Sequence, residues 1–323
     1  MRIVITGALG HIGSLLLRSL PAALAQEDQH CEIVLIDNLL TQRFPSLFNL
    51  PDDGLYTFFE MDVTTDDLRP LFENADVVIH LAAITDAASS FNNGEEVERN
   101  NFEGTKAVAH ACLATGAKMI HLSSTSVYGT QEETIDEFCS SDELKPQSPY
   151  AECKLKEEAL LQELGEQSAL EFVICRFGTI CGVSPGIRFH TAVNKFCWQA
   201  VMNQPITVWT TALHQKRPYL ALEDAMRAFA FIINNQLFDR QVYNVLTDNF
   251  TVNDIIEAIK SHIPNPKIEF VDTQIMNQLS YEVLNARFGE KGFKTSASIE
   301  EAIADTMKLL KGIRNHAHSS KLT

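Results

Sequence analysis

A tyrosine and a lysine stand four positions apart within the stretch 149–154. Because residues i and i+4 share one face of a helix, the hydroxyl of Tyr150 and the ammonium of Lys154 are predicted to project together. A tyrosine hydroxyl, which titrates near ~10, can act as a base near neutral pH only where a positive charge stabilises its anion. The pair therefore suggests proton transfer at Tyr150 assisted by Lys154, although the same spacing is common on helix surfaces that do no chemistry.

Residues 123–126 all carry hydroxyl side chains, and they stand at the end of a predicted strand. Ser124 and Thr125 are the candidates for hydrogen bonds to a substrate oxygen beside the phenol. A strand end rich in Ser and Thr is usually only a turn or a cap. A functional role for these hydroxyl groups is therefore predicted only because the glycine-rich nucleotide turn and the pair of Tyr150 and Lys154 occur in the same chain.

Three glycines follow the first predicted strand with two residues between each pair. Gly7 permits a tight turn, Gly10 lets the backbone approach a pyrophosphate, and Gly13 lets the following helix pack closely on the strand. The helix that begins at His11 and Ile12 would offer free N–H groups and the positive end of its dipole to the phosphates. The spacing predicts a dinucleotide site that needs no basic side chain at this turn.

Asp37 ends the second predicted strand, where a carboxylate can accept hydrogen bonds from an adenosine ribose and would repel a 2′-phosphate. NAD is therefore predicted as the cofactor in preference to NADP; the alternative is an ordinary turn residue before Asn38. An open α/β sheet binds its ligand at the carboxyl ends of its strands. The further cofactor candidates at the ends of the third and fourth strands are Asp62, Val63, Leu81, Ala82 and Ala83.

Short β-branched runs alternate with longer segments of helical periodicity through the first half of the chain, which is typical of a parallel sheet covered by helices on both faces. The order of elements predicts an α/β fold with a doubly wound parallel Rossmann sheet. The predicted strands span residues 3–6, 33–37, 56–60, 77–81, 119–123 and 172–176, and the predicted helices span residues 11–24, 101–113 and 150–164.

The alternation ends after Arg176, where glycine and proline become frequent. Beyond it we predict helices over residues 191–202 and 221–233, a strand over 205–210, and helices that start near Val252 and Ile299. These expectations give a nucleotide-binding domain over residues 1–176 with a return at about 218–248, a smaller α/β substrate-binding lobe over 177–217 and 249–314, and a flexible tail over 315–323.

The charge balance narrows the possible partners. The 323 residues include 26 Lys and Arg against 42 Asp and Glu, a formal net charge of −16. Such a chain lacks the positive field that binding to nucleic acid or to an anionic membrane surface requires. The sequence contains neither a signal peptide nor an apolar stretch long enough to span a bilayer, so we expect a cytoplasmic protein. The seven cysteines lack CxxC or paired metal spacing, which favours reduced thiols and predicts no metal site.

These motifs together resemble the extended short-chain dehydrogenases/reductases, in the group of NAD-dependent nucleotide-sugar epimerases and dehydratases. The motifs occur in order over about two-thirds of the chain. They comprise the glycine turn, Asp37 with Asn38, Asp62 with Val63, His80 with Leu81, Ala82 and Ala83, Asn101 with Gly104 and Thr105, the segment 123–129, Tyr150 with Lys154, Arg176, and Arg217 with Tyr219, Leu220, Glu223 and Asp224.

The resemblance implies a role for each catalytic residue. Tyr150 would be the acid and base, and Lys154 would modify its pKa and bind the nicotinamide ribose. Ser124 would orient the reacting sugar oxygen while hydride passes between the sugar and the nicotinamide. Asn101 and Phe177 would join the cofactor-binding residues.

The residues beside Ser124 distinguish reactions within this family. Family dehydratases carry an Asp-Glu pair where this chain has Thr125 and Ser126, and decarboxylases keep a Glu at the place of Ser126. The pattern here resembles that of 4-epimerases, in which NAD oxidises C4, the keto sugar rotates, and hydride returns to the other face. We expect a 4-epimerase that favours a UDP-sugar. The alternatives are a dehydrogenase, reductase or dehydratase of the same family and, more remotely, an NAD-binding sensor without catalysis.

Substrate-binding candidates lie mainly in the second lobe. Arg188, Asn194 and Arg217 are candidates for the diphosphate, because arginine presents a fork suited to phosphate. Trp209 could stack on the base. The alternatives are a surface ion pair for Arg188 and a core position for Trp209.

Three further residues concern the sugar. Thr85 and Asp86, just after the fourth strand, are expected to face it. Thr179 stands where family members carry an asparagine that contacts the sugar nucleotide. Family members also commonly pair two helices with those of a twin, so the apolar faces near residues 101–113 and 150–164 predict a homodimer.

Overall fold

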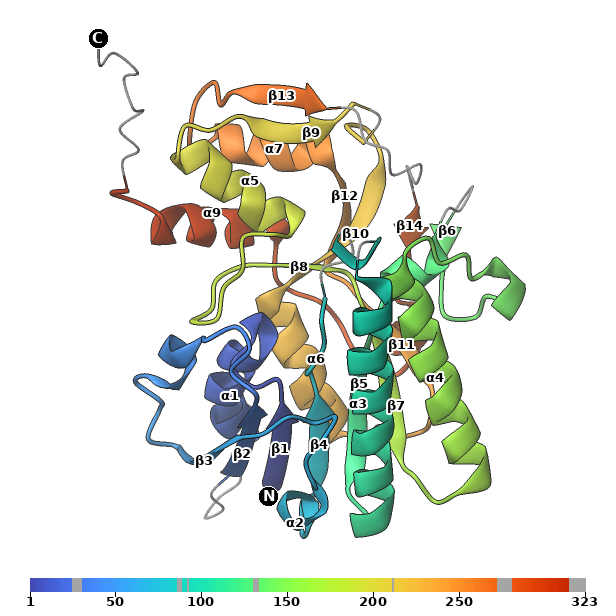
Figure 1. Ribbon diagram of the computed structural model, residues 1–323. Helices are drawn as coiled ribbons and strands as arrows, with labels where there is room; N and C mark the ends of the chain where they lie inside the picture. The colour runs from blue at the N-terminus through green and yellow to red at the C-terminus, as the bar shows by residue number, and fades with distance from the viewer. Residues whose placement is uncertain are drawn as a thin grey trace.

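The computed structural model describes residues 1–24, 31–85, 89–91, 93–129, 134–210, 212–271 and 281–313. Its largest element is a seven-stranded parallel sheet in the order β11-β7-β5-β4-β1-β2-β3 (Figure 1). The predicted doubly wound α/β fold is confirmed. The strands of this sheet are β1 (Arg2–Thr6), β2 (Cys31–Asp37), β3 (Gly54–Glu60), β4 (Val77–His80), β5 (Lys118–Ser124), β7 (Phe172–Phe177) and β11 (Val242–Val245).

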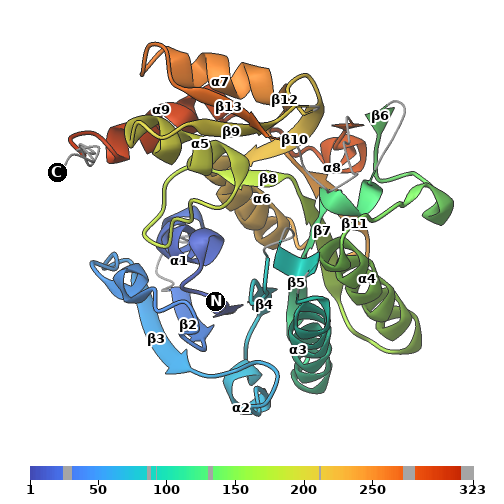
Figure 2. The same ribbon diagram turned by 45° about the horizontal axis from the view of Figure 1, so that its top comes forward.

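Helices cover both faces of the sheet, as Figure 2 shows most clearly. Successive strand residues point to opposite faces, so Ile3 and Ile5 of β1 pack in the core beneath α1 and α6, whereas Val4 packs beneath α2, α3 and α4. The covering helices are α1 (His11–Leu24), α2 (Arg69–Phe72), α3 (Gly94–Thr115), α4 (Pro149–Gln167) and α6 (Leu222–Asn234).

Helix α3 begins earlier than the sequence predicts. Its apolar periodicity is visible only from Asn101, because Val97 is the one buried residue in the first two turns. The helix ends at Thr115 and is capped by Gly116, whose φ of 77° is the left-handed conformation that glycine adopts freely. Helix α4 begins where its pattern predicts, since the Ser148 hydroxyl accepts a hydrogen bond from the Ala151 N–H at 3.1 Å.

The second lobe has its own core, in which Cys197, Ile255 and Ile303 come from three different helices. The helix and strand predicted over 191–202 and 205–210 are α5 (Ala192–Val201) and β9 (Ile206–Trp209), and helices α7 (Val252–Lys260) and α9 (Ile299–Leu309) start where predicted. The remaining elements are β8 (Thr179–Cys181), β10 (Lys216–Ala221) and β12 (Asp248–Thr251) in one sheet, β13 (Ile268–Val271) beside β9, β6 (Thr134–Ile135) beside β14 (Glu282–Val283), and α8 (Ala286–Glu290).

The chain returns to the large sheet through α6 and β11. Strand β11 pairs in parallel with β7, with Val242 opposite Ile174 and Val245 opposite Phe177. In the part of the chain described, the helices include none long and apolar enough to cross a membrane, and no cluster of three or more His, Cys, Asp or Glu side chains could hold a metal ion. The seven cysteines are all free. The tail predicted over 315–323 lies outside the described residues.

A buried ion pair fastens α4 to the sheet. The Arg176 guanidinium of β7 contacts both carboxylate oxygens of Glu158, with Nε–Oε1 and Nη2–Oε2 distances of 3.0 and 2.6 Å. The Ser123 hydroxyl of β5 donates to the same carboxylate. Both charged side chains are buried, and such bidentate pairs are among the stronger polar contacts in proteins.

Replacing Glu158 with alanine should therefore destabilise the fold, because the substitution leaves the Arg176 charge buried without a counter-charge. We expect a loss of about 3–5 kcal/mol in the free energy of unfolding, measured by urea denaturation. Glu166→Ala, an exposed position on the same helix, should change it by less than about 0.5 kcal/mol. Equal stabilities for the two variants would contradict this account of the pair.

Candidate active site

A cavity of about 520 Å³ lies along the carboxyl ends of the large sheet and is also lined by the second lobe. The structure brings most of the predicted site residues to its wall. Those residues are Gly7, Gly10, His11, Ile12, Gly13, Asp37, Asn38, Asp62, Val63, Leu81, Ala82, Ala83, Thr85, Ser124, Thr125, Tyr150, Lys154, Phe177, Thr179, Arg188, Trp209 and Arg217.

Two predicted residues do not line the cavity and instead brace its wall. The Asn101 side chain accepts from the Ile84 N–H at 2.8 Å and donates to the Ile84 carbonyl at 2.9 Å, which fixes the chain just after β4. The Asn194 amide, fully buried, accepts from Gly182 N–H at 3.2 Å and donates to the Arg188 carbonyl at 3.1 Å. Asp86 lies outside the described residues.

The glycine turn leaves a space that side chains would fill. Gly7 has a φ of +66°, and a Cβ atom there would lie 2.6 Å from the Ala82 backbone nitrogen, so only glycine fits between β1 and the chain after β4. The turn passes directly into α1, whose first N–H groups lack partners within the helix. These groups point a positive helix end at the cavity, as phosphate binding requires.

Asp37 is held at the end of β2 by two backbone groups. Its Oδ2 accepts from the Leu9 N–H and its Oδ1 from the Leu39 N–H, each at 3.0 Å. A carboxylate has about four acceptor positions, so two remain for ribose hydroxyls. The glycine turn, the helix end and this carboxylate form a donor and acceptor set that fits a dinucleotide.

The catalytic candidates meet at the junction of β5 and α4. Ser124 caps the short 3-10 helix Thr125–Tyr128, with its Oγ accepting from the Ser126 N–H at 3.2 Å. Its hydroxyl acts to lower the pKa of Tyr150, which also lines the cavity. The Lys154 ammonium lies 5.9 Å from the centroid of the Tyr150 ring. The structure thus brings the three predicted residues together in one corner of the cavity.

Burial controls the protonation of the phenol. It raises the pKa of Tyr150, and the opposing effects of Lys154 and Ser124 do not cancel it. The hydroxyl is therefore protonated at neutral pH in the protein alone. Tyr150 is ready to donate a proton, and it needs a further positive charge beside it to accept one.

The family of the chain follows from a comparison with known proteins. A model of the NAD dependent epimerase/dehydratase family matches residues 3–245. The chain belongs to this family. NAD is the cofactor of the family, and the glycine turn, the α1 terminus and Asp37 are the residues that would hold it here.

Relatives in this family carry several activities. A trifunctional UDP-glucose 4,6-dehydratase/UDP-4-keto-6-deoxy-D-glucose 3,5-epimerase/UDP-4-keto-L-rhamnose-reductase of Arabidopsis thaliana is 28% identical over 325 residues, covering 94% of this chain and 46% of that protein. The chain thus spans about half the length of that relative. An uncharacterized UDP-glucose epimerase of Bacillus subtilis is 27% identical over 252 residues, or 76% of each chain.

Several solved structures share the fold. A UDP-glucuronic acid 4-epimerase from Bacillus cereus, in complex with UDP-glucuronic acid and NAD, superposes with a TM-score of 0.82 at 24% identity, covering 96% of this chain and 99% of that one. A UDP-glucose 4-epimerase from Thermus thermophilus in complex with NAD gives 0.79 at 22% identity, with coverage of 97% and 99%.

Residues 182–190 of the second lobe form a strap. The strap contacts the glycine turn and the start of α1, which together we call the cofactor turn. The Ser184 Oγ lies 2.7 Å from His11 Nδ1, and the Gly186 N–H donates to Ser14 Oγ at 2.9 Å. Arg43 donates to the Gly186 carbonyl at 3.0 Å. Burial, with smaller effects of nearby cations, lowers the pKa of His11 to about 3, so its imidazole is neutral.

The sequence identified only Arg188 of the strap as a site residue. Arg43, His190 and Tyr281 also line the cavity, and none of them belongs to a recognised motif. The cluster of Gly182, Pro185 and Gly186 was the available signal, since glycine often marks a close approach of two backbones. Which backbones approach each other could not be read from it.

The second lobe contributes several side chains to the cavity wall. Arg188 Nη1 donates to the Thr85 hydroxyl at 2.8 Å, which ties the strap to the chain after β4. The Arg217 guanidinium lies 5.9 Å from the Trp209 ring centroid. Tyr281 and Thr125 also line the cavity. Cationic and aromatic groups of the second lobe therefore face the cavity.

The fit of the strap makes Gly186 sensitive to substitution. A Cβ atom there would lie 2.5 Å from the Leu9 carbonyl oxygen and 2.6 Å from that of Gly10. Overpacking of this kind costs about 1–3 kcal/mol, so in Gly186→Ala we expect NAD to bind roughly five- to hundredfold more weakly, measured by isothermal titration calorimetry.

Gly289→Ala is the matched control, because a Cβ atom at Gly289 would meet no other atom within 4 Å. Its affinity for NAD should equal that of the unmodified protein. An unchanged affinity in Gly186→Ala would show that the strap yields without disturbing the cofactor turn.

Proposed function

We propose that the protein is an NAD-dependent nucleotide-sugar 4-epimerase that favours UDP-sugars and inverts C4 by transient oxidation and return of hydride. The observation that carries this proposal is the composition of the cavity beside Tyr150. The carboxylates among its described lining residues are Asp37 and Asp62, which follow β2 and β3 in the cofactor half. In the described part of the lining, the corner formed by Tyr150, Lys154 and Ser124 therefore holds no carboxylate that could act as a second acid or base.

A 4-epimerase needs no more than this set. Ser124 and Tyr150 would hold the C4 oxygen of the sugar between their hydroxyl groups. Tyr150 takes the hydroxyl proton as C4 is oxidised and returns it when C4 is reduced, so the cycle has no net proton demand. Lys154 stabilises the phenolate in between. NAD, when bound, supplies the acceptor and donor of hydride.

Dehydration would need more. Expelling a hydroxyl as water requires an acid at the leaving oxygen and a base at the neighbouring carbon. Thr125 is buried and its hydroxyl donates to the Phe177 carbonyl at 3.3 Å, and the Ser126 hydroxyl donates to Ser124 at 2.9 Å. Neither supplies a carboxylate, which favours epimerisation over the dehydratase activity named for the Arabidopsis relative.

The second lobe would hold the nucleotide and the diphosphate. We assign Arg217 and Arg188 to the phosphates and Trp209 to the base, because arginine forks match phosphate oxygens and an indole offers a stacking face. A volume of about 520 Å³ is within the range of small-molecule sites. The structures of UDP-sugar complexes with the same fold support a UDP-sugar.

We also propose a homodimer through the outer faces of α3 and α4. These two helices pack side by side on one face of the sheet (Figure 1). The mass in solution, measured by light scattering, should be twice that of the chain.

The reaction is tested by incubation with a panel of UDP- and GDP-sugars, followed by NMR of the sugar products. We expect inversion at C4 without net formation of NADH. Steady accumulation of NADH would identify a dehydrogenase, and loss of water from the sugar would identify a dehydratase. Binding of NAD without turnover of any sugar would support a sensor.

Substitution of Tyr150 tests its assigned role. In Tyr150→Phe the ring stays but the proton acceptor is lost, so kcat should fall by about 10²–10⁴ while KM for the sugar nucleotide changes little. Tyr56→Phe is the control, because the Tyr56 hydroxyl has no hydrogen-bond partner in the described part of the chain. Comparable kcat values for the two variants would remove Tyr150 from the reaction.

A further inference from the structure

A buried carboxylate that the proposed mechanism does not use lies beside the catalytic lysine. Glu157 follows Lys154 by one helical turn in α4 and is 0% exposed. Its Oε2 accepts from the Lys154 ammonium at 2.8 Å. Lys154 itself is 4% exposed. The two charges therefore form an ion pair in the interior, against the wall of the cavity.

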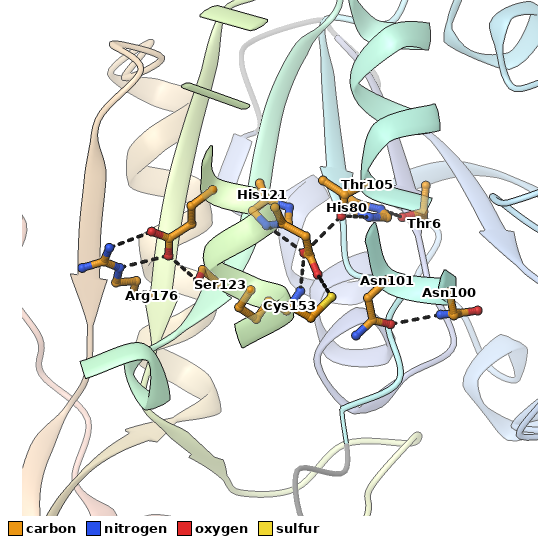
Figure 3. A network of polar contacts seen from close by, with 12 residues as sticks. Thr6, His80, Asn100, Asn101, Thr105, His121, Ser123, Cys153 and Arg176 are labelled. Carbon is orange, nitrogen blue, oxygen red and sulfur yellow. Dashed lines mark hydrogen bonds and ion pairs between the residues drawn. The ribbon is translucent and has the colours of Figure 1, made fainter. Parts of the chain in front are cut away.

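Groups from three elements hold the Glu157 carboxylate in place. The Thr105 hydroxyl of α3 donates to Oε2 at 3.1 Å, and the Cys153 thiol of α4 donates to Oε1 at 3.2 Å. His121 Nε2 of β5 lies 3.2 Å from Oε2. Figure 3 shows Thr105, Cys153 and His121 converging on this point from different sides.

The network continues toward the cofactor turn. Thr105 Oγ1 lies 3.2 Å from His80 Nε2, and His80 Nδ1 lies 2.8 Å from the Thr6 hydroxyl at the end of β1. Figure 3 places His80 between Thr105 and Thr6. The Glu157 carboxylate is therefore fixed by contacts that reach from α4 through α3 and β4 to β1.

The surrounding charges favour a fully ionised pair. Burial acts to lower the pKa of Lys154, but Glu157 and then Tyr150 outweigh it and the pKa is raised. Burial acts to raise the pKa of Glu157, but Lys154 and His121 hold it below its usual range.

The other titratable groups that face the pair are uncharged at neutral pH. Burial lowers the pKa values of His80, to about 3, and of His121. Burial also raises the pKa of Cys153 to about 12 and that of Tyr150. Glu158, which faces His121, is paired with Arg176. The charge on Lys154 is therefore balanced by Glu157.

We propose that Glu157 is a positioning residue, which fixes the Lys154 ammonium beside Tyr150 and keeps it protonated over the working pH range. The proposal rests on the proposed function, because Lys154 must be charged when Tyr150 gives up its proton. Without Glu157, a buried ammonium would have no counter-charge, and such groups lose their proton far more readily than exposed lysines.

The test compares Glu157→Gln with Glu152→Gln, an exposed position on the same helix with the same change in charge. In Glu157→Gln the basic limb of the kcat–pH profile should move to lower pH by at least about one unit. At neutral pH kcat should fall roughly tenfold or more with little change in KM. Glu152→Gln should match the unmodified protein, and a Glu157→Gln profile identical to it would overturn the proposal.

The titration of Tyr150 gives a readout that does not depend on turnover. Tyrosinate absorbance is followed against pH, and the difference from the same protein carrying Tyr150→Phe isolates this phenol. If Lys154 loses its proton without Glu157, the Tyr150 titration in Glu157→Gln should not move to lower pH. Movement to lower pH would show that Lys154 stays charged alone, and would overturn the proposal.

Glu157→Asp keeps the carboxylate charge but shortens the side chain, so it tests the two properties separately. It also serves as the test if circular dichroism shows that Glu157→Gln does not fold. The basic limb should stay at its original pH, while kcat falls several-fold because the shorter side chain draws the ammonium away from Tyr150. A basic limb shifted to lower pH, or an unchanged kcat, would overturn the proposal. A chain that catalyses another sugar reaction would fail the C4 assay and still give these titrations.

Discussion

A buried ammonium that keeps its proton needs a counter-charge close by, and the pairing of Lys154 with Glu157 at 2.8 Å is the contact on which the proposed catalytic corner depends. The pair sits where α4 meets α3 and β5, and the contacts of Glu157 reach as far as β1 through Thr105 and His80. The packing of the two helices on the sheet and the protonation of Tyr150 are therefore linked. A neighbouring pair, Glu158 with Arg176, fastens the same helix to β7 and lies outside the cavity lining.

An acidic chain can still bind anionic ligands, because the groups that attract anions are gathered at the cavity. The cofactor turn presents backbone N–H groups and a helix end rather than cations. The cations among the described lining residues of the cavity are Lys154, Arg43, Arg188 and Arg217. Arg188 belongs to the strap and donates to Thr85, and Arg43 donates a hydrogen bond to the strap at Gly186. A net charge of −16 thus excludes little about a small anionic ligand, because the local arrangement decides its binding.

Local patterns predicted the parts of the site that depend on local structure. The glycine turn, Asp37, Ser124 and the pair of Tyr150 and Lys154 stand at strand ends or helix starts, and their positions follow from the order of elements. Glu157 could not be recognised in this way, because a Lys and Glu three residues apart on a helix usually form an exposed pair. Gly186 and Tyr281 reach the site through neighbours that are far away in the sequence. Gly186 lies against Gly10, and Tyr281 lies near Thr125. Asn101 and Asn194 were predicted to contact ligands, but their side chains hydrogen-bond to backbone groups behind the cavity wall. The sequence could not show this, because their positions relative to the cavity depend on loop conformation.

In the proposed reaction Tyr150 and Lys154 suffice because the hydrogen that leaves C4 of the sugar returns to C4. The direct measurement is turnover of a UDP-sugar that carries deuterium at C4, in ordinary water, with the product examined by NMR. The account predicts a product inverted at C4 that keeps its deuterium there and takes up no solvent hydrogen at any carbon. Loss of the label to water, or solvent hydrogen at C5, would contradict it.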